Sequence, residues 1–206
     1  MASIARKIIL NVPFRKQLTE SSCFPACIRM VLRYYGVVVD EKWLWKCGMI
    51  LPHTGTWDVT LAPVLKKLGY KTITYWSGSI DGWSNTVPLE TREKYKDLYS
   101  KSVGSGVLVH RRNASISLMK KYILSGVPVL AEVNADIFYG EKCGWTHMIV
   151  IVGFSKNFFF FHDPDKHFGG DFLRVGFSRF RKSWENLSSL AGRSMFVILP
   201  KNKRNL

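Results

Sequence analysis

Apolar residues recur at helical spacing in the segment that follows Ser22. They stand at i, i+3, i+4 and i+7 and so form one face of a helix: Ile28, Val31, Leu32 and Tyr35. Ser22 is a good N-terminal cap, Pro25 is tolerated in a first turn, and Gly36 suits the left-handed residue that ends many helices. The pattern therefore predicts a helix that begins at Cys23 and buries its apolar face.

The rest of the chain shows both periodicities, with helical segments gathered toward its start. Helices are expected at residues 41–50, 57–68, 90–100, 115–124 and 178–186. Strands are expected at residues 7–14, 70–76, 107–110, 127–133, 147–154, 158–162, 172–175 and 195–200. This order predicts an α+β fold in one domain over residues 1–206, with a helical lobe at about 15–76 packed on an antiparallel sheet lobe at about 107–200. The turn-rich residues 77–85 would join the two lobes.

Two of the expected strands are the most apolar part of the chain. Residues 147–154 and 158–162 are dense in Ile, Val and Phe and flank a short turn at 155–157, so they should pair as a buried antiparallel hairpin. If the turn centres on its first residue, His147 stands directly opposite Asp163, and facing Cβ atoms lie about 4.5–5.5 Å apart. An aspartate at that separation can accept the imidazole N–H and stabilise the imidazolium.

Cys23 is placed where a thiol is easily activated. Unpaired backbone N–H groups and the helix dipole favour negative charge at the first turn of a helix, and so favour the thiolate. A cysteine nucleophile, a histidine base and a carboxylate that orients the histidine are the three groups that acyl chemistry needs. Each has a plainer alternative: Cys23 as a small buried hydrophobe, His147 as a hydrogen-bonded structural residue, and Asp163 as part of a turn.

The composition limits the setting of such a site without defining it. Of 206 residues, 47% are hydrophobic, which is enough for a full core, and 30 Lys and Arg against 15 Asp and Glu leave a net charge of +15. A nucleic-acid or acidic protein partner would fit this charge, but the basic residues are spread out as on a solvated surface, so neither is predicted. There is no signal peptide, no apolar run of about 18 residues and no disulfide scaffold, so a cytoplasmic protein without a membrane span is expected.

A set of spacings runs through residues 10–200. Its members are Gln17, Cys23, Ala26, Met30 and residues 34–36, followed much later by His147, Asp163 and Pro164. No single motif among them is specific, but the combination resembles the papain-like cysteine peptidase family that removes leader peptides from bacteriocins, often called double-glycine peptidases.

The resemblance implies a cysteine peptidase that cleaves a peptide or protein substrate through a thioacyl intermediate, with no metal and no organic cofactor. Cys23 would be the nucleophile, His147 the general base and Asp163 the residue that orients the imidazole. Gln17 would stabilise the oxyanion through its side-chain amide, together with the Cys23 backbone N–H. The residues selected by local chemistry and by the resemblance are the same.

The chain departs from the family pattern beside the cysteine, where Ser22 and Phe24 stand in place of the usual Asp and Gly. The larger Phe24 side chain can narrow the approach to the thiol. The same fold also hosts acyltransferases, which share the acyl-thioester step but use another acceptor. A catalytically silent binding module for nucleic acid or an acidic protein is the alternative from a different class.

Other residues compete for the roles of His147 and Asp163. His162 is next to Asp163 but points to the opposite face of the strand, and His167 follows in the loop. Asp165 lies beyond Pro164 in the expected turn. Either histidine would replace His147 if the strand register were different.

Two further patterns favour a structural role. Cys23 and Cys27 lie four residues apart on one helix and can in principle bind zinc with Cys47, Cys143 or a histidine, although no short C-x-x-C pair is present. Aromatic residues interleave with Arg and Lys in residues 177–184, and their spacing fits a core-facing stripe better than a base-stacking platform.

Overall fold

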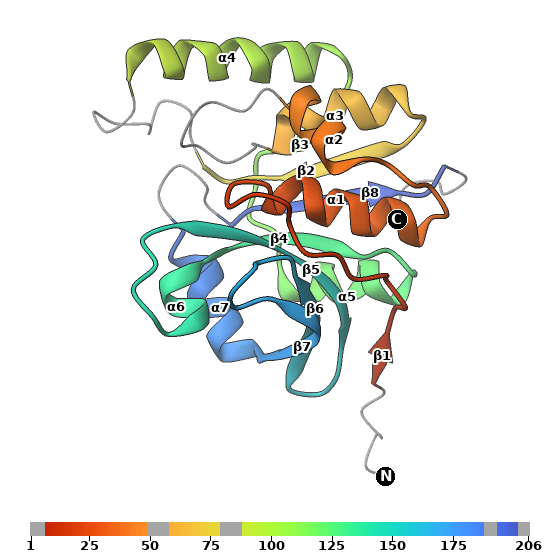
Figure 1. The fold of residues 1–206 in the computed structure, drawn as a ribbon, viewed down its shortest axis with the longest axis vertical. Coiled ribbons are helices and arrows are strands. Elements are labelled where there is room, and N and C mark those ends of the chain that lie inside the picture. The colour runs from red at the N-terminus through yellow and green to blue at the C-terminus, as the bar shows by residue number, and fades with distance from the viewer. Residues whose placement is uncertain (1–6, 49–57, 79–87, 188–192, 202–206) are drawn as a thin grey trace.

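One mixed β-sheet with helices on both faces organises the protein (Figure 1). The computed structural model describes residues 7–48, 58–78, 88–187 and 193–201. The strands are β1 (Ile8–Ile9), β2 (Lys71–Tyr75), β3 (Leu108–His110), β4 (Val129–Asn134), β5 (Thr146–Phe154), β6 (Phe158–Asp163), β7 (Gly170–Gly176) and β8 (Met195–Leu199). The helices are α1 (Cys23–Tyr34), α2 (Glu41–Cys47), α3 (Asp58–Lys67), α4 (Leu89–Gly104), α5 (Ile116–Leu124), α6 (Ala135–Tyr139) and α7 (Phe177–Glu185).

The elements confirm the predicted α+β fold. The strand order is β3-β2-β8-β4-β5-β6-β7, and β1 pairs with β5 beside this path. The strand pairs are antiparallel as expected except β2 and β3, which run parallel. β2 lies between β3 and β8, so a strand from the N-terminal part of the chain is built into the same sheet as the later strands. Most of the turn-rich stretch 77–85 falls outside the described residues.

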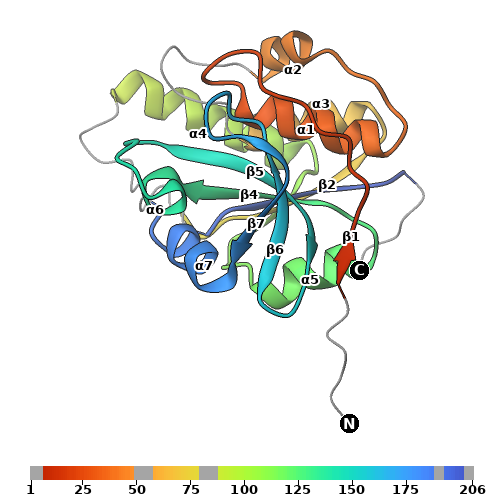
Figure 2. The same ribbon diagram turned by 60° about the horizontal axis from the view of Figure 1, so that its bottom comes forward.

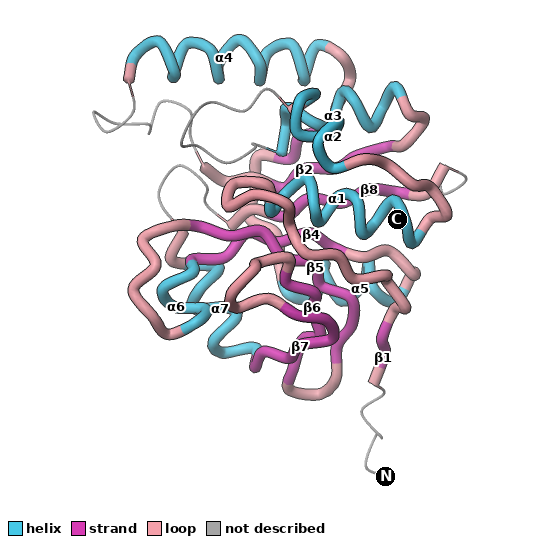
Figure 3. The backbone as a smooth tube through the Cα atoms, viewed as in Figure 1, coloured by secondary structure: helices cyan, strands magenta, loops and turns pink. Residues whose placement is uncertain are grey.

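Two predictions of local structure need correction. The strand expected at residues 7–14 is only β1, and residues 10–22 are a long loop that leads to α1 (Figure 3). The Leu10 N–H still donates to the Val152 carbonyl at 2.7 Å, but the Val12 N–H donates to the nearby Leu10 carbonyl, so the chain leaves the sheet before Pro13. The short helix α6, directly after β4, was not expected from the sequence.

Each face of the sheet has its own hydrophobic core, because side chains alternate along the strands. On β5, Ile149 and Ile151 join the core covered by α5, α6 and α7, whereas Met148 and Val150 join the core under α1, α2 and α3. Figure 2 shows these two groups of helices on opposite sides of the sheet. On α7 the aromatic stripe faces the first of these cores, with Phe180 fully buried, as the sequence predicted.

β1 and β5 approach each other closely in the sheet. The two strands pair antiparallel at Gly153, where a Cβ atom would lie only 2.3 Å from the Ile8 carbonyl oxygen. Only glycine fits this contact without movement of the backbone. Next to Gly153 the pairing of β5 with β6 is interrupted between Ile151 and Gly153, which is a β-bulge.

Candidate active site

Helix α1 begins at Cys23, as the sequence predicted, and Cys23 is partly exposed. Phe24 is 1% exposed and packs edge-to-face on a phenylalanine of β8, so its ring belongs to the core and is not exposed beside the thiol. One turn later, the Cys27 Sγ donates a hydrogen bond of 3.3 Å to the Met148 carbonyl on β5. This contact fastens α1 to the residue that follows His147.

His147 and Asp163 lie at the same end of neighbouring strands. His147 is near the start of β5 and Asp163 is the last residue of β6, and their side chains are 3% and 0% exposed. The His147 Nε2 lies 2.8 Å from the Asp163 Oδ1, so the ring donates a hydrogen bond to the carboxylate. The two residues are brought together as the sequence predicted.

The register that produces this contact differs from the predicted one. The ladder pairs Val150 with His162, which places Asp163 opposite Ile149 and not opposite His147. A shift of two residues keeps every side chain on its original face, because the faces of a strand alternate with a period of two. His147 and Asp163 are therefore diagonal neighbours on one face, and their hydrogen bond forms although the predicted register was wrong.

The Cys23 thiol lies close enough to His147 to influence its protonation. Since Nε2 is used by the carboxylate, only Nδ1 remains to take a proton from that thiol. Burial alone would lower the pKa of His147, but Asp163, through its hydrogen bond and its charge, and Cys23 raise that pKa to about 10. The imidazolium is thus favoured at neutral pH, which suits an ion pair with a thiolate.

Asp163 accepts three hydrogen bonds. Oδ1 accepts from His147 and, at 2.9 Å, from the Asp165 backbone N–H, while Oδ2 accepts from the Tyr139 hydroxyl at 2.7 Å. Burial acts to raise the pKa of Asp163, but these bonds, that of His147 first, lower it below its ordinary value. The group that faces His147 is therefore a carboxylate, fixed in position by its donors.

Tyr139 is the residue that sequence reasoning missed. Burial, followed by the charge of Asp163, raises the pKa of Tyr139, so its hydroxyl stays protonated and donates. Its ring stacks on Phe168, with centroids 4.4 Å apart. The side chain of Asn134 caps α6 and Gly140 ends it at φ 84°, and this Asn and Gly pair is the signal that marks a one-turn helix. No local signal points from Tyr139 to Asp163.

Gln17 is buried in the loop before α1, where it is tied to the Asp163 segment. Its backbone N–H donates to the Pro164 carbonyl at 2.8 Å, and the side chain is 3% exposed. The side-chain Nε2 donates a long hydrogen bond, 3.3 Å, to the Glu20 carbonyl. The part that Gln17 plays toward an oxyanion stays a prediction.

The competing residues have structural contacts of their own. His162 is fully buried on the opposite face, where its Nε2 donates to the Val12 carbonyl at 2.7 Å and its Nδ1 accepts from the Phe172 N–H at 3.0 Å. Burial lowers the pKa of His162. The Asp165 Oδ1 accepts the backbone N–H groups of the turn that contains His167, each hydrogen bond being 2.8 Å long. His162 therefore does not take the place of His147, and Asp165 does not take the place of Asp163.

The four cysteines do not gather into one cluster. All are free thiols, and only Cys27 is fully buried. Within the described ranges, no group of three or more His, Cys, Asp and Glu side chains is arranged to hold a metal ion. The zinc arrangement considered from the sequence is therefore not seen among these residues.

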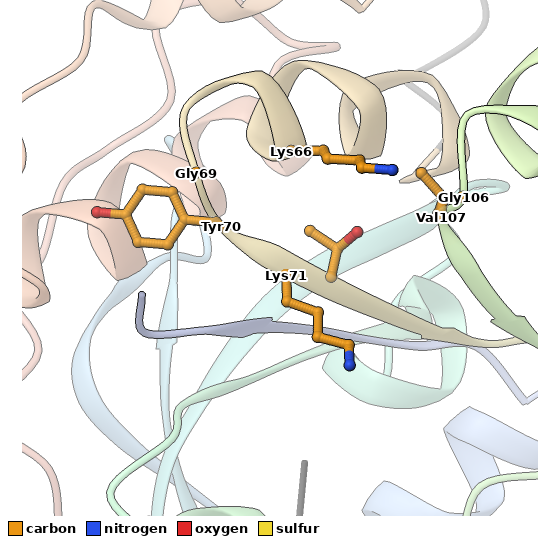
Figure 4. Close-up of a pocket in the computed structure, with 7 residues that line it drawn as sticks. Lys66, Gly69, Tyr70, Lys71, Gly106 and Val107 are labelled. Carbon is orange, nitrogen blue, oxygen red and sulfur yellow. The ribbon is translucent and has the colours of Figure 1, made fainter. Parts of the chain in front are cut away.

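A surface pocket lies apart from these residues, with a volume of about 340 Å³. It is lined by Lys66, Gly69, Tyr70, Lys71, Thr72, Gly106 and Val107, from the end of α3, the start of β2 and the segment before β3. Figure 4 shows the Lys66 and Lys71 side chains on opposite sides of it. None of the residues selected from the sequence lines this pocket.

The helices give no sign of a membrane span. The longest helix in the described part of the chain, α4, has 16 residues and is polar. None of the described helices is both long enough and apolar enough to cross a bilayer.

A helix that begins at a cysteine, packed on strands that hold a hydrogen-bonded histidine and aspartate, is the arrangement of papain-like α+β proteins. The chain belongs to the Peptidase_C39 like family, whose sequence profile matches residues 9–192. Membership of this family supports a peptidase-type function.

Three solved structures share this fold. A C39-like peptidase from Bacillus anthracis has a TM-score of 0.59 and 18% sequence identity, over 98% of this chain and 100% of that one. The peptidase domain of Streptococcus ComA, a bifunctional ABC transporter of a quorum sensing pathway, has a TM-score of 0.53 and 16% identity, over 92% and 99%. A double glycine motif protease from an AMS/PCAT transporter, in complex with the leader peptide, has a TM-score of 0.54 and 15% identity, over 94% and 97%.

A curated protein also matches the sequence. Guanylyl cyclase 1 of Arabidopsis thaliana is 27% identical in an alignment 179 residues long, and the match covers 75% of this chain. The chain covers 65% of the length of that relative. The name describes the plant protein, and no activity is carried from it to this chain.

Proposed function

We propose that this protein is a cysteine peptidase in which Cys23 is the nucleophile, His147 the general acid and base, and Asp163 the residue that orients His147. The observation that carries the proposal is the buried hydrogen bond of 2.8 Å between His147 and Asp163, beside the Cys23 thiol at the start of α1. Family and fold support the peptidase class. The role proposed for each residue follows from its chemistry and its place in this arrangement.

The proposed reaction has two steps, acylation of Cys23 and hydrolysis of the resulting thioester. The Cys23 thiolate attacks the carbonyl carbon of the scissile amide, and the C–S bond forms as the oxygen becomes an oxyanion. The His147 imidazolium then gives its proton to the amine as the C–N bond breaks, which leaves a thioester on Cys23. Water attacks the thioester carbon as His147 accepts its proton, and the C–S bond then breaks, which releases the acid product and restores the thiolate and the imidazolium.

Gln17 is the proposed oxyanion donor, together with the Cys23 backbone N–H. In the free protein the Gln17 Nε2 donates only a long hydrogen bond, 3.3 Å, to the Glu20 carbonyl. A weak contact of this kind is readily exchanged for a charged oxygen, because hydrogen bonds to an ionised acceptor are about twice as strong. The pair would then stabilise the developing charge.

The setting of this activity is part of the proposal. We expect residues 1–206 to act as one domain on a peptide or protein substrate, in the cytoplasm and without a cofactor. A peptide substrate is supported by the structural neighbour that was solved with a leader peptide. The net charge of +15 would attract an acidic substrate segment more strongly than a basic one.

The proposal is tested with a library of peptides from a digested proteome, incubated with the wild-type protein or with Cys23→Ser. New peptide ends that require Cys23 would establish hydrolysis. Added glycinamide distinguishes the acyltransferase alternative, since an acyltransferase would form amide products in place of free acids. Identical peptide profiles for both proteins, with and without glycinamide, would overturn the proposal.

A further inference from the structure

A buried carboxylate lies beneath the loop that leads to Cys23. Glu41, the first residue of α2, is 1% exposed. Its Oε1 accepts the Leu18 backbone N–H at 2.7 Å and the Ser22 hydroxyl at 2.7 Å. The Glu41 Oε1 therefore binds both Leu18 and Ser22, the two ends of the short segment that precedes Cys23.

Arg29 joins the same group from α1. Its Nη1 lies 3.3 Å from the Glu41 Oε2, and its Nη2 donates to the Lys16 carbonyl at 3.4 Å. A carboxylate removed from water costs several kcal/mol unless it is paired and hydrogen-bonded, and here Glu41 has both kinds of partner. The pair connects α1 and α2 to the loop at three separate residues.

These contacts surround the two proposed oxyanion donors. Lys16 and Leu18 are the chain neighbours of Gln17, and Ser22 directly precedes Cys23. Gln17 is also anchored on its other side, because its N–H donates to the Pro164 carbonyl. The distance between Gln17 and the Cys23 backbone N–H is thus set by a network in which Glu41 is the shared acceptor.

The capping needs of the helices do not explain Glu41. Ser22 is the N-cap residue of α1, yet its side chain makes no capping hydrogen bond and is directed to Glu41 instead. The N-terminus of α2 is capped by the neighbouring Asp40, whose carboxylate accepts the Trp43 N–H at 2.8 Å. Glu41 and Asp40 are therefore adjacent carboxylates with different partners. Glu41 accepts hydrogen bonds from the loop before α1, and Asp40 accepts one from its own helix.

We propose that Glu41, paired with Arg29, is a positioning residue that holds Gln17 and the Cys23 backbone N–H at the separation an oxyanion requires. The inference rests on the proposed function of Cys23 and Gln17. It assigns to Glu41 no contact with the substrate. Its effect should appear only in steps that pass through an oxyanion.

Two reactions of Cys23 separate this role from general support of the fold. Acylation by p-nitrophenyl acetate passes through an oxyanion, whereas alkylation by iodoacetamide does not. Glu41→Gln should slow acylation by about 10- to 100-fold, as expected for a misplaced catalytic group. Alkylation should change by less than about two-fold, because the thiol and His147 are untouched. Asp40→Asn is the matched control and should leave both rates unchanged, since Asn also caps helices well.

A double variant tests the connection to Gln17. Gln17→Ala combined with Glu41→Gln should slow acylation by less than the product of the two single effects, because both changes act on the same oxyanion site. Unchanged acylation in Glu41→Gln would overturn the inference. Equal losses of acylation and alkylation would also overturn it, since Glu41 would then support the nucleophile or the whole fold.

Amide hydrogen exchange gives a readout that needs no activity. Glu41→Gln should accelerate exchange at Gln17, whose N–H is bonded to Pro164 and not to Glu41, while Asp40→Asn should not. If the wild-type protein shows no Cys23-dependent acylation, the proposed function fails. Faster exchange at Gln17 would then still support the positioning of the loop by Glu41, and unchanged exchange would refute it.

Discussion

Two cysteines and two histidines lie on the same three elements, and they differ in their surroundings. Cys23 and Cys27 are one turn apart on α1, and the first is partly exposed whereas the second is fully buried. His147 is on β5 and His162 on β6, and both are buried. The amino-acid types are identical in the two pairs, so the difference between them comes from their partners.

The partners of each histidine set its charge. His147 lies between a carboxylate and a thiol, and its pKa is raised, whereas His162 lies between a carbonyl and a backbone N–H, and its pKa is lowered. Both nitrogens of His162 are used by the backbone, which leaves none for a thiol. Cys27 is equally committed, since burial raises its pKa and its Sγ donates to Met148. Burial with backbone partners favours the neutral form of His162, whereas a buried carboxylate beside His147 favours the imidazolium that the proposed function requires.

The largest difference is expected when each of the two cysteines is replaced in turn. Cys23→Ser should lower kcat/KM for p-nitrophenyl acetate by at least about 1,000-fold, because no other group can form the thioester. Cys27→Ala should keep kcat/KM within about five-fold and lower the free energy of unfolding by about 1–2 kcal/mol, through the lost hydrogen bond and packing. Steady-state kinetics and urea unfolding measure both effects. Equal losses of activity would show that the two thiols do not differ as described.

Alkylation compares the same thiols without a substrate. At about pH 6, iodoacetamide should modify Cys23 at least about 100-fold faster than Cys27, because Cys27 is buried and holds its proton. His147→Ala should slow the reaction of Cys23 by about 10-fold or more, whereas His162→Gln should not. Mass spectrometry of each cysteine between about pH 5 and 9 gives the rates. If Cys23 reacted no faster than Cys27, the thiol would not be activated in the free protein, and the binding-module alternative would gain support.

Asp163 is the partner that distinguishes His147 from His162. Asp163→Asn should reduce kcat by about 10- to 100-fold with little change in KM, since the amide oxygen still orients the ring but no longer stabilises its charge. Asp165→Asn, the same change two residues further on, should leave kcat unaltered, because its side chain caps the turn at His167. Similar losses in both variants would point to damage of the turn and not to lost charge.

The two histidines should give stability of opposite pH dependence. While Cys23 and Asp163 are both in place, the raised pKa of His147 stabilises the fold fully below about pH 6.5. This contribution is lost as pH rises toward the folded pKa. The lowered pKa of His162 has the reverse sign, so stability is lost as pH falls below about 6.5. Urea unfolding across pH should show that His147→Gln flattens the alkaline decline and His162→Gln the acid one. The same slope change in both variants would contradict the assignment.

The smallest effect concerns the tyrosine that supports the carboxylate. Tyr139→Phe should lower kcat/KM by about 3- to 10-fold, because Asp163 loses one hydrogen bond worth about 1 kcal/mol. Tyr35→Phe is the control, since the Tyr35 hydroxyl also donates, but to the Ile198 carbonyl on β8. Its kinetics should match the wild type. A loss in Tyr35→Phe equal to that in Tyr139→Phe would mean that the effect comes from weakened packing.

Local sequence accounts for much of the fold and for the three central residues of the candidate site. The start of α1 at Cys23 follows from periodicity and from Pro25 in the first turn, which act within one or two turns of the chain. The shared face of His147 and Asp163 follows from the alternation of side chains, which survives any even shift of register. The same alternation also predicts that His162 points to the face of the strand opposite to that of Asp163.

Long-range packing accounts for the rest, because periodicity carries no information about which distant segments meet. The close approach of Ile8 to Gly153 joins β1 to a strand that begins more than 130 residues later, and the support of Asp163 depends on Tyr139, 24 residues earlier in the chain. The contact of Glu41 with Ser22 likewise joins residues 19 positions apart, one at the start of α2 and one directly before α1. The type of a side chain and the face of the helix or strand on which it lies are set by a short segment of sequence. The residues that support a candidate site residue from elsewhere in the chain are decided by the way the segments pack.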